Sequence, residues 1–150
     1  MNESLLRMLQ EHVEMTVDLY RKDLHAFAPN DLTRSPGAPA RSAADIVFEV
    51  ILNNRRASRR LRGEDAGPGP GFPACPPELQ SAEALATEVA DSCEELLAAV
   101  GMDPFRMIEY PGGSEIALSY GEFAVLHMQY HLGQLNYLQT VFGDAEIHWG

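Results

Sequence analysis

The sequence predicts an all-α protein, a four-helix bundle with one small β-hairpin before its last helix. Four stretches of about 20 residues repeat apolar side chains at the three-and-four spacing of an α-helix. Segments rich in proline and glycine separate these stretches, and a helix cannot continue through them. The chain has 150 residues, of which 45% are hydrophobic, enough to build one core. We therefore expect residues 1–150 to form a single bundle domain.

The first and third predicted helices are ordinary amphipathic ones. The first spans about residues 5–24 and ends before Pro29, and its apolar positions are Leu5, Leu9, Val13, Val17, Tyr20 and Leu24. The third begins near Ser81 and ends at Gly101, and its apolar positions are Leu85, Val89, Ser92 or Cys93, Leu96 and Val100. Because each has one apolar side, both are expected to pack against neighbours in the bundle.

Start and stop signals bound the second predicted helix, which runs from about 43 to 62. Ser42 and Asp45 have the spacing of a capping box, with Asp in place of the usual Glu, and Gly63 ends the helix. The segment 63–77 that follows holds so many glycines and prolines that it must be an irregular loop. A loop of that length is commonly either mobile or functional, and we expect a mobile one.

The last third of the chain combines the hairpin with the fourth helix. Two short apolar runs, 107–110 and 115–118, flank the turn sequence 111–114, Pro-Gly-Gly-Ser, and this pattern predicts a hairpin. The fourth helix occupies about 120–142, and Gly143 ends it. A two-stranded hairpin is marginal alone, so it is expected to pack on the helices.

Composition excludes several function classes. The formal net charge of −11 leaves no basic face for a nucleic acid or an acidic membrane surface, so neither is expected as a partner. Residues 1–14 carry several charges and lack the apolar core of a signal peptide, and no long apolar stretch suits a membrane span. Cys75 and Cys93 are too few for a secreted disulfide framework, although one bridge between them stays open. A cytoplasmic location is the simplest expectation.

The fourth helix carries the residues with the most evident chemistry. On a helical wheel His127, His131 and Gln134 lie on one face. The same face carries Tyr120, Phe123, Leu138 and Val141. Gln129, Gly133 and Asn136 lie on the opposite face. Two imidazoles one turn apart can converge on one divalent ion, as helical histidine pairs do in metal sites. The alternative is a pair of hydrogen-bonded core histidines, but burying so polar a stripe without a shared partner is costly.

Two segments of the chain resemble the DinB-like (YfiT-like) superfamily of metalloenzymes. The run HMQYHLGQL, residues 127–135, resembles the fourth helix of that family, and residues 42–50 with Asn53 resemble the start of its second helix. The resemblance implies an up-down-down-up bundle, usually a homodimer, in which three ligands hold zinc, nickel or a similar ion such as manganese or iron. Members with known reactions include transferases that use a low-molecular-weight thiol and a thiol-dependent maleylpyruvate isomerase. Gln134 and Asn53 are expected to bind the substrate.

The sequence departs from the family pattern at the third ligand. That ligand is ordinarily a histidine on the second helix, and the matching position here is Glu49. A carboxylate beside two histidines is a legitimate set that leaves coordination positions open. Two alternatives remain: metal binding has been lost, or Glu49 pairs with Arg56 or another basic residue. On the wheel Glu49 falls at the flank of the apolar face, which decides neither way.

Other polar residues have simpler expected roles. His12 and His25 lie beside the apolar stripe of the first helix and are expected at the surface. His148 and Trp149 follow the last helix, and we expect Trp149 to pack on the bundle, with the alternative that His148 folds back to the site opening. Nothing near Cys75 in the sequence lowers the pKa of its thiol, so it is not expected to be a nucleophile.

One cluster concentrates positive charge in this acidic chain. Its members are Arg55, Arg56, Arg59, Arg60 and Arg62. We expect them to neutralise neighbouring acids, with the alternative that they receive the carboxylates of a thiol cofactor or a small acidic substrate.

The sequence thus predicts a divalent-metal-dependent enzyme acting on a small molecule, a thiol-dependent transferase ahead of a hydrolase. The predicted metal ligands are His127, His131 and Glu49; Glu49 would be a candidate general base if it is not a ligand. The alternative is a non-catalytic dimeric bundle that binds a small molecule and has lost its metal. No P-loop, GxGxxG run or Ser-His-Asp order supports nucleotide chemistry or serine hydrolysis.

Overall fold

The computed structural model describes residues 2–149 and confirms the all-α bundle with one hairpin. Its elements are α1 (Asn2–Ala26), α2 (Ala43–Leu61), the 3-10 turn η1 (Pro77–Leu79), α3 (Ala82–Met102), β1 (Met107–Tyr110), β2 (Gly113–Ile116) and α4 (Ala117–Val141). Within this described part of the chain, no helix combines the length and the apolar character that a membrane crossing requires.

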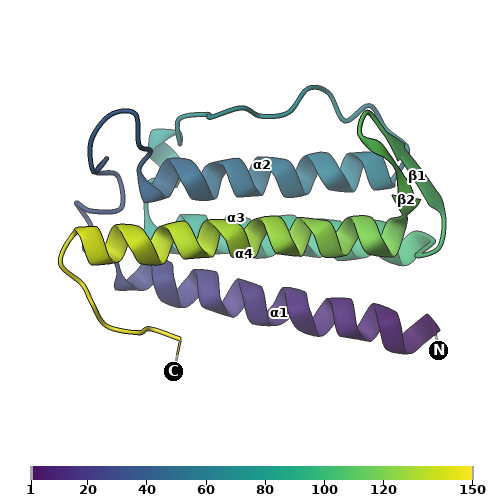
Figure 1. Ribbon diagram of the computed structural model, residues 1–150, viewed down its shortest axis with the longest axis horizontal. Coiled ribbons are helices and arrows are strands. Elements are labelled where there is room, and N and C mark those ends of the chain that lie inside the picture. Colours follow the sequence, from purple (N-terminus) through teal and green to yellow (C-terminus); the bar gives the residue numbers. More distant parts are fainter. Residues whose placement is uncertain (1, 150) are drawn as a thin grey trace.

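The four helices are arranged up-down-down-up. In Figure 1 α1 and α4 run in one direction, whereas α2 and α3 run in the other. α1 packs against α3 and α4, and α2 packs against the same two helices, so α1 and α2 lie diagonally across the bundle. The segment 63–77 runs back along α2 to reach the start of α3, and the hairpin lies at the end of the bundle where α3 finishes and α4 begins (Figure 1). This order is the one that the family resemblance implies.

The core lies between the predicted apolar faces. Leu9, Val13, Tyr20 and Leu24 of α1 are buried, as are Leu85, Val89, Cys93, Leu96 and Val100 of α3. Each large aliphatic side chain buried in this way contributes about 1.5–3 kcal/mol of transfer free energy. The hydroxyl of Tyr20 is fully buried and donates a hydrogen bond to the main-chain oxygen of Met128 at 2.8 Å, which ties α1 to α4.

The capping box of α2 forms only in part. Ser42 caps the helix as predicted, because its Oγ accepts a hydrogen bond from the Asp45 N–H at 3.2 Å. The Asp45 carboxylate does not reach back to the cap; it accepts the Cys75 N–H at 2.7 Å. Asp45 therefore fastens the end of the 63–77 loop to α2.

The hairpin is confirmed, but its second strand lies two residues earlier than the predicted run 115–118, at Gly113–Ile116. β1 and β2 pair antiparallel, with Met107 opposite Ile116 and Tyr110 opposite Gly113. Ala117 and Leu118 belong to α4 instead of the strand, and both are buried. Their main-chain N–H groups donate to the oxygens of residues 106 and 104 just before the hairpin, which anchors the first turn of α4.

The buried face of α4 is rotated from the one that the helical wheel predicts. Phe123 and Val141, placed on the core face, are exposed, and Asn136, placed opposite, reaches buried Asp23 of α1. α4 is flanked by α1 on one side and α2 on the other, so its contact surface is broad. His131 is buried at the edge facing α2, whereas His127 is only half-buried there.

The C-terminal tail is fastened to the bundle through Asp23. Trp149 Nε1 donates to both carboxylate oxygens of Asp23, at 3.1 and 3.2 Å, and Asn136 Nδ2 donates to Oδ2 at 2.6 Å. Trp149 thus contacts the bundle, as expected, through the N–H of its indole ring, while the residue stays exposed. His148 contacts Asp144 at 2.8 Å instead of the predicted ligands on α2 and α4. Burial raises the pKa of the Asp23 carboxyl above its ordinary value, more than the donors lower it.

This raised pKa predicts how Asp23 affects stability with pH. A carboxyl whose pKa is raised on folding holds its proton more tightly in the folded state, so stability falls as pH rises from the ordinary value of 3.8 through the folded pKa. We expect the free energy of unfolding of the wild type, minus that of Asp23→Asn, to decrease with rising pH in this window and then level off. Urea unfolding at a series of pH values, followed by fluorescence of the single tryptophan, measures it. A difference that grows with pH would contradict the assignment.

Candidate metal centre

Glu49 of α2 and two histidines of α4 bring three potential ligand atoms together. His127 Nε2 and His131 Nε2 are 3.1 Å apart. Glu49 Oε1 lies 3.8 Å from His127 Nε2, and Glu49 Oε2 lies 3.8 Å from His131 Nε2. The three predicted ligands therefore converge from two neighbouring helices, with all donor atoms within 4.8 Å of one another.

Gln134 fixes the tautomer of His131. Gln134 Oε1 lies 2.7 Å from His131 Nδ1, and Gln134 Nε2 donates to the Tyr130 hydroxyl at 3.3 Å. Because the amide oxygen can only accept, Nδ1 of His131 carries the proton and Nε2 is left with a lone pair. That lone pair faces Nε2 of His127, so Nε2 of His131 is available as a metal ligand on the side where the second histidine lies.

Two side chains hold Glu49. Asn53 Nδ2 donates to Glu49 Oε1 at 3.3 Å from one turn further along α2, and Arg41 Nη1 pairs with Glu49 Oε2. Glu49 is 8% exposed, so an unpaired carboxylate here would be costly. The alternative expected from the sequence, pairing with a basic residue, is thus realised with Arg41 while Glu49 also faces the histidines. Asn53 and Gln134, predicted to bind substrate, both contact the candidate ligands directly.

The geometry and chemistry of this set fit a divalent ion. Ligand atoms about 2.1 Å from a tetrahedral zinc lie about 3.4 Å from one another, and the donor separations here lie on either side of that value. Two imidazole nitrogens and one carboxylate oxygen are ligands that zinc, nickel, iron and manganese accept. Three protein ligands leave at least one position for an exogenous molecule, as in catalytic sites.

The electrostatics keep both histidines ready to act as ligands. Burial lowers the pKa of His127, and the neighbouring His131 lowers it further, against an opposing effect of Glu49. Burial also lowers the pKa of His131, although Gln134 and Glu49 oppose it. Both rings are therefore neutral near pH 7, which is the form that binds a metal.

The three residues lie in the wall of an open cavity of about 500 Å³. It is bounded by α2, α4 and the two long connections of the chain, and its lining includes Arg41, Phe72, Tyr130, Tyr137, Pro36 and Pro39. The Arg41 guanidinium lies over the Phe72 ring, 4.6 Å from its centroid. Arg41 and Phe72 were not predicted from the sequence, because both lie in irregular segments where no periodicity places a side chain.

Comparison with known proteins identifies the fold. No family model matches the sequence, and no curated protein matches it. The crystal structure of a DinB-like protein from Bacillus cereus ATCC 10987, at 2.01 Å resolution, is similar with a TM-score of 0.69, and the match covers 94% of this chain and 92% of that one. The chain has the DinB-like fold. Sequence identity over the match is 15%, so this likeness concerns the fold alone.

The remaining candidates take no part in the site that this DinB-like bundle forms. His12 lies 3.4 Å from Glu122 and His25 lies 3.5 Å from Glu83, both in partly exposed pairs. Both cysteines are free thiols. Burial raises the pKa of Cys75 to about 11 and that of Cys93 to about 12, so neither is a nucleophile near neutral pH.

The arginines at the end of α2 neutralise acids in part, as expected. Arg55 pairs with Glu88 at 2.8 Å and with Glu95 at 3.2 Å, so it links α2 to α3. Arg62 pairs with Glu64 at 2.6 Å. Arg60 points elsewhere on the DinB-like bundle, where it donates to the Tyr120 hydroxyl at 3.0 Å.

Proposed function

We propose that the chain is a divalent-metal-dependent enzyme that acts on a small molecule through Glu49, His127 and His131. The observation that carries the proposal is the convergence of these three donors in the wall of a cavity large enough for a small organic molecule. Zinc and nickel are the first candidates, because two histidines and one glutamate hold zinc in known catalytic sites and imidazole suits both metals; manganese and iron are the next candidates. Transfer involving a low-molecular-weight thiol is the first reaction type, and hydrolysis is the second.

The residues around the donors have definable tasks in such a reaction. A divalent ion held here would supply Lewis acidity, which makes a thiol or water a better nucleophile at neutral pH. Gln134 keeps His131 in one tautomer, and Asn53 orients Glu49. Arg41 adds a positive charge to the cavity wall, which favours an anionic substrate group or negative charge that develops during the reaction.

The aromatic part of the cavity would bind the rest of the substrate. The rings of Phe72, Tyr130 and Tyr137 are largely exposed. Tyr130 and Tyr137 both belong to α4 and lie about two turns apart. Rings of this kind offer apolar contact area and exclude water from a reaction at the cavity wall. A small substrate with an apolar body and one anionic group would therefore match the walls.

A non-catalytic dimeric bundle is the second candidate. Large apolar side chains of α4 are exposed at helical spacing, namely Phe123, Leu126, Tyr130, Tyr137 and Val141. Such a stripe favours association with a second copy of the chain. A homodimer is compatible with both candidates, so oligomeric state does not decide between them.

Metal content tests the proposed function. Protein purified without an affinity tag is analysed by inductively coupled plasma mass spectrometry, and metal-loaded protein is assayed for thiol-dependent transfer and for hydrolysis. We expect near-stoichiometric zinc or nickel, and turnover that requires the metal. Protein that takes up no divalent ion even after reconstitution would overturn the enzyme proposal in favour of the non-catalytic bundle.

Gln134 is predicted to strengthen metal binding without touching the metal. In Gln134→Leu the Nδ1 atom of His131 loses its acceptor, so both the tautomer and the ring orientation become less defined. We expect zinc affinity to fall by about 10- to 100-fold, the usual cost of losing such a partner. Competition titration with a chromophoric chelator measures it. Gln129→Leu, an exposed change on the same helix, is the control and should leave the affinity unchanged.

A further inference from the structure

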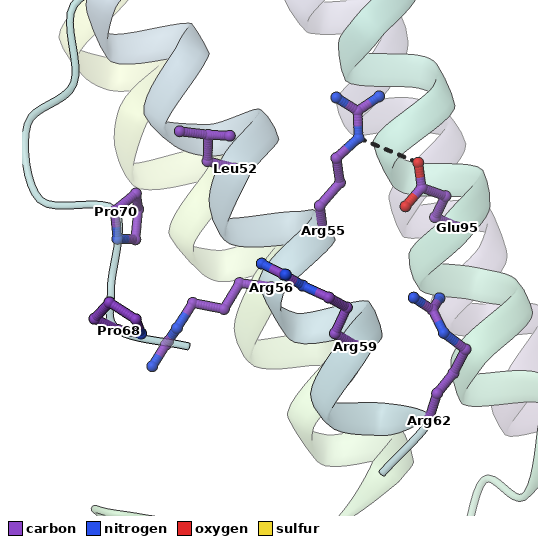
Figure 2. A pocket seen from close by; sticks show the side chains of 8 residues that line it. All are labelled: Leu52, Arg55, Arg56, Arg59, Arg62, Pro68, Pro70 and Glu95. Carbon is purple, nitrogen blue, oxygen red and sulfur yellow. Dashed lines mark hydrogen bonds and ion pairs between the residues drawn. The ribbon is translucent and has the colours of Figure 1, made fainter. Parts of the chain in front are cut away.

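A second cavity, here called the arginine pocket, lies between α2 and the 63–77 loop. It measures about 480 Å³ and is lined by Leu52, Arg55, Arg56, Arg59, Arg62, Pro68, Pro70 and Glu95. Figure 2 shows Arg55, Arg56 and Arg59 on α2 and Arg62 at the C-terminal end of this helix, with Pro68 and Pro70 on the loop beside them. Four guanidinium groups thus share this wall with a single carboxylate.

Two of the four arginines form no ion pair with any residue in the described range 2–149. Arg55 and Arg62 have carboxylate partners, and the bond from Arg55 to Glu95 is visible in Figure 2. Arg56 donates only to a neutral acceptor, the main-chain oxygen of Gly67 at 3.2 Å. Within residues 2–149, Arg59 has no ion pair and no side-chain hydrogen bond. The two free charges are conspicuous because the chain carries a net charge of −11 with 22 acids available to neutralise them.

The loop turns this charged helix face into a concave site. Arg56 holds the loop at Gly67, and the loop places two rigid proline rings across from α2. A concave, partly apolar wall weakens the screening of charge by water compared with a flat surface. Guanidinium forks bind phosphate and carboxylate groups bidentately, which matches two unpaired arginines to a ligand with two negative charges.

We propose that the arginine pocket binds a small dianion, with the chemistry of a phosphate group or a dicarboxylate, through Arg56 and Arg59. The inference rests on the unpaired charges and the cavity, and it does not depend on the proposed function. Arg56 also lines a small cavity of about 110 Å³ that His127 lines as well. The arginine pocket is therefore a neighbour of the candidate metal centre but has its own walls.

Calorimetric titration of the full chain tests the site. The probes are sodium phosphate and sodium malonate, at an ionic strength held constant with sodium chloride. We expect each titration to show one site, and Arg56→Gln/Arg59→Gln to bind at least about tenfold more weakly, because two charge-assisted contacts are lost. Tighter binding of phosphate would indicate a phosphorylated ligand, and tighter binding of malonate a dicarboxylate; either supports the site.

Matched variants separate this site from general charge effects and from the metal centre. Arg7→Gln/Arg21→Gln removes the same charge from exposed positions of α1 and should bind both anions as the wild type does. His127→Ala/His131→Ala should also keep anion binding, so failure of the proposed function leaves this result intact. The inference is overturned if neither anion binds at millimolar concentration, or if the α1 variant weakens binding equally. Thermal unfolding of each variant checks that the fold is retained.

Discussion

His127→Ala/His131→Ala is expected to lose high-affinity zinc binding, because only one of the three donors remains. Glu49→Gln should weaken binding by at least about 100-fold, more than the loss of an outer hydrogen-bonding partner costs, since a neutral amide replaces the only anionic donor. Chelator competition measures both affinities, and mass spectrometry of the purified proteins measures the metal retained. His12→Ala/His25→Ala removes two histidines from α1 and should change neither quantity.

The Glu49 variant decides between the two roles left open by its position. If Glu49 serves only as the partner of Arg41, Glu49→Gln will bind zinc as tightly as the wild type does. If Glu49 is a ligand, the affinity falls even though the amide keeps the shape of the side chain. A stable fold is expected in either case, because the glutamine oxygen can still accept from Arg41 or Asn53. If the double-histidine variant binds zinc as tightly as the wild type does, these residues do not form a metal centre.

The helices and the hairpin were accessible from the sequence for identifiable physical reasons. Apolar periodicity defines the faces of α1 and α3, and the caps at Ser42 and Ser81 accept main-chain N–H groups as such residues do. The turn residues of 111–114 predict the hairpin. The second strand ended early because periodicity cannot separate a short apolar strand from the first turn of a helix that follows it at once.

The candidate site was only partly accessible, because a helical wheel describes one helix and not its neighbours. The wheel of α2 puts Glu49 at the flank of its apolar face, and the candidate metal centre lies at the border where this flank meets α4. Arg41 could not be foreseen, since it approaches Glu49 from the irregular segment before α2. Phe72 reaches the cavity along the path of a long loop, which no local pattern encodes.

Gly121 of α4 packs closely against α3 and α1, so a larger residue at this position is expected to destabilise the fold strongly. At Gly121 an added Cβ would lie 2.9 Å from Val100 Cγ2 and 3.1 Å from Leu9 Cδ2, both in fully buried side chains. We expect Gly121→Val to lower the free energy of unfolding by about 2–3 kcal/mol, because overpacking of the core outweighs the small gain in helix propensity. Urea unfolding followed by circular dichroism measures the loss.

Two further variants test whether crowding at Gly121 is the cause. A Cβ at Gly133 of the same helix would meet nothing within 4 Å, so Gly133→Val should stay within about 0.5 kcal/mol of the wild type. Val100→Ala removes the nearest obstacle, and combined with Gly121→Val it should recover at least about 1 kcal/mol relative to the sum of the single changes. Strict additivity would show that Gly121 is needed for another reason. A positive coupling would show that the approach of α4 to α3 and α1 requires a residue without a side chain here.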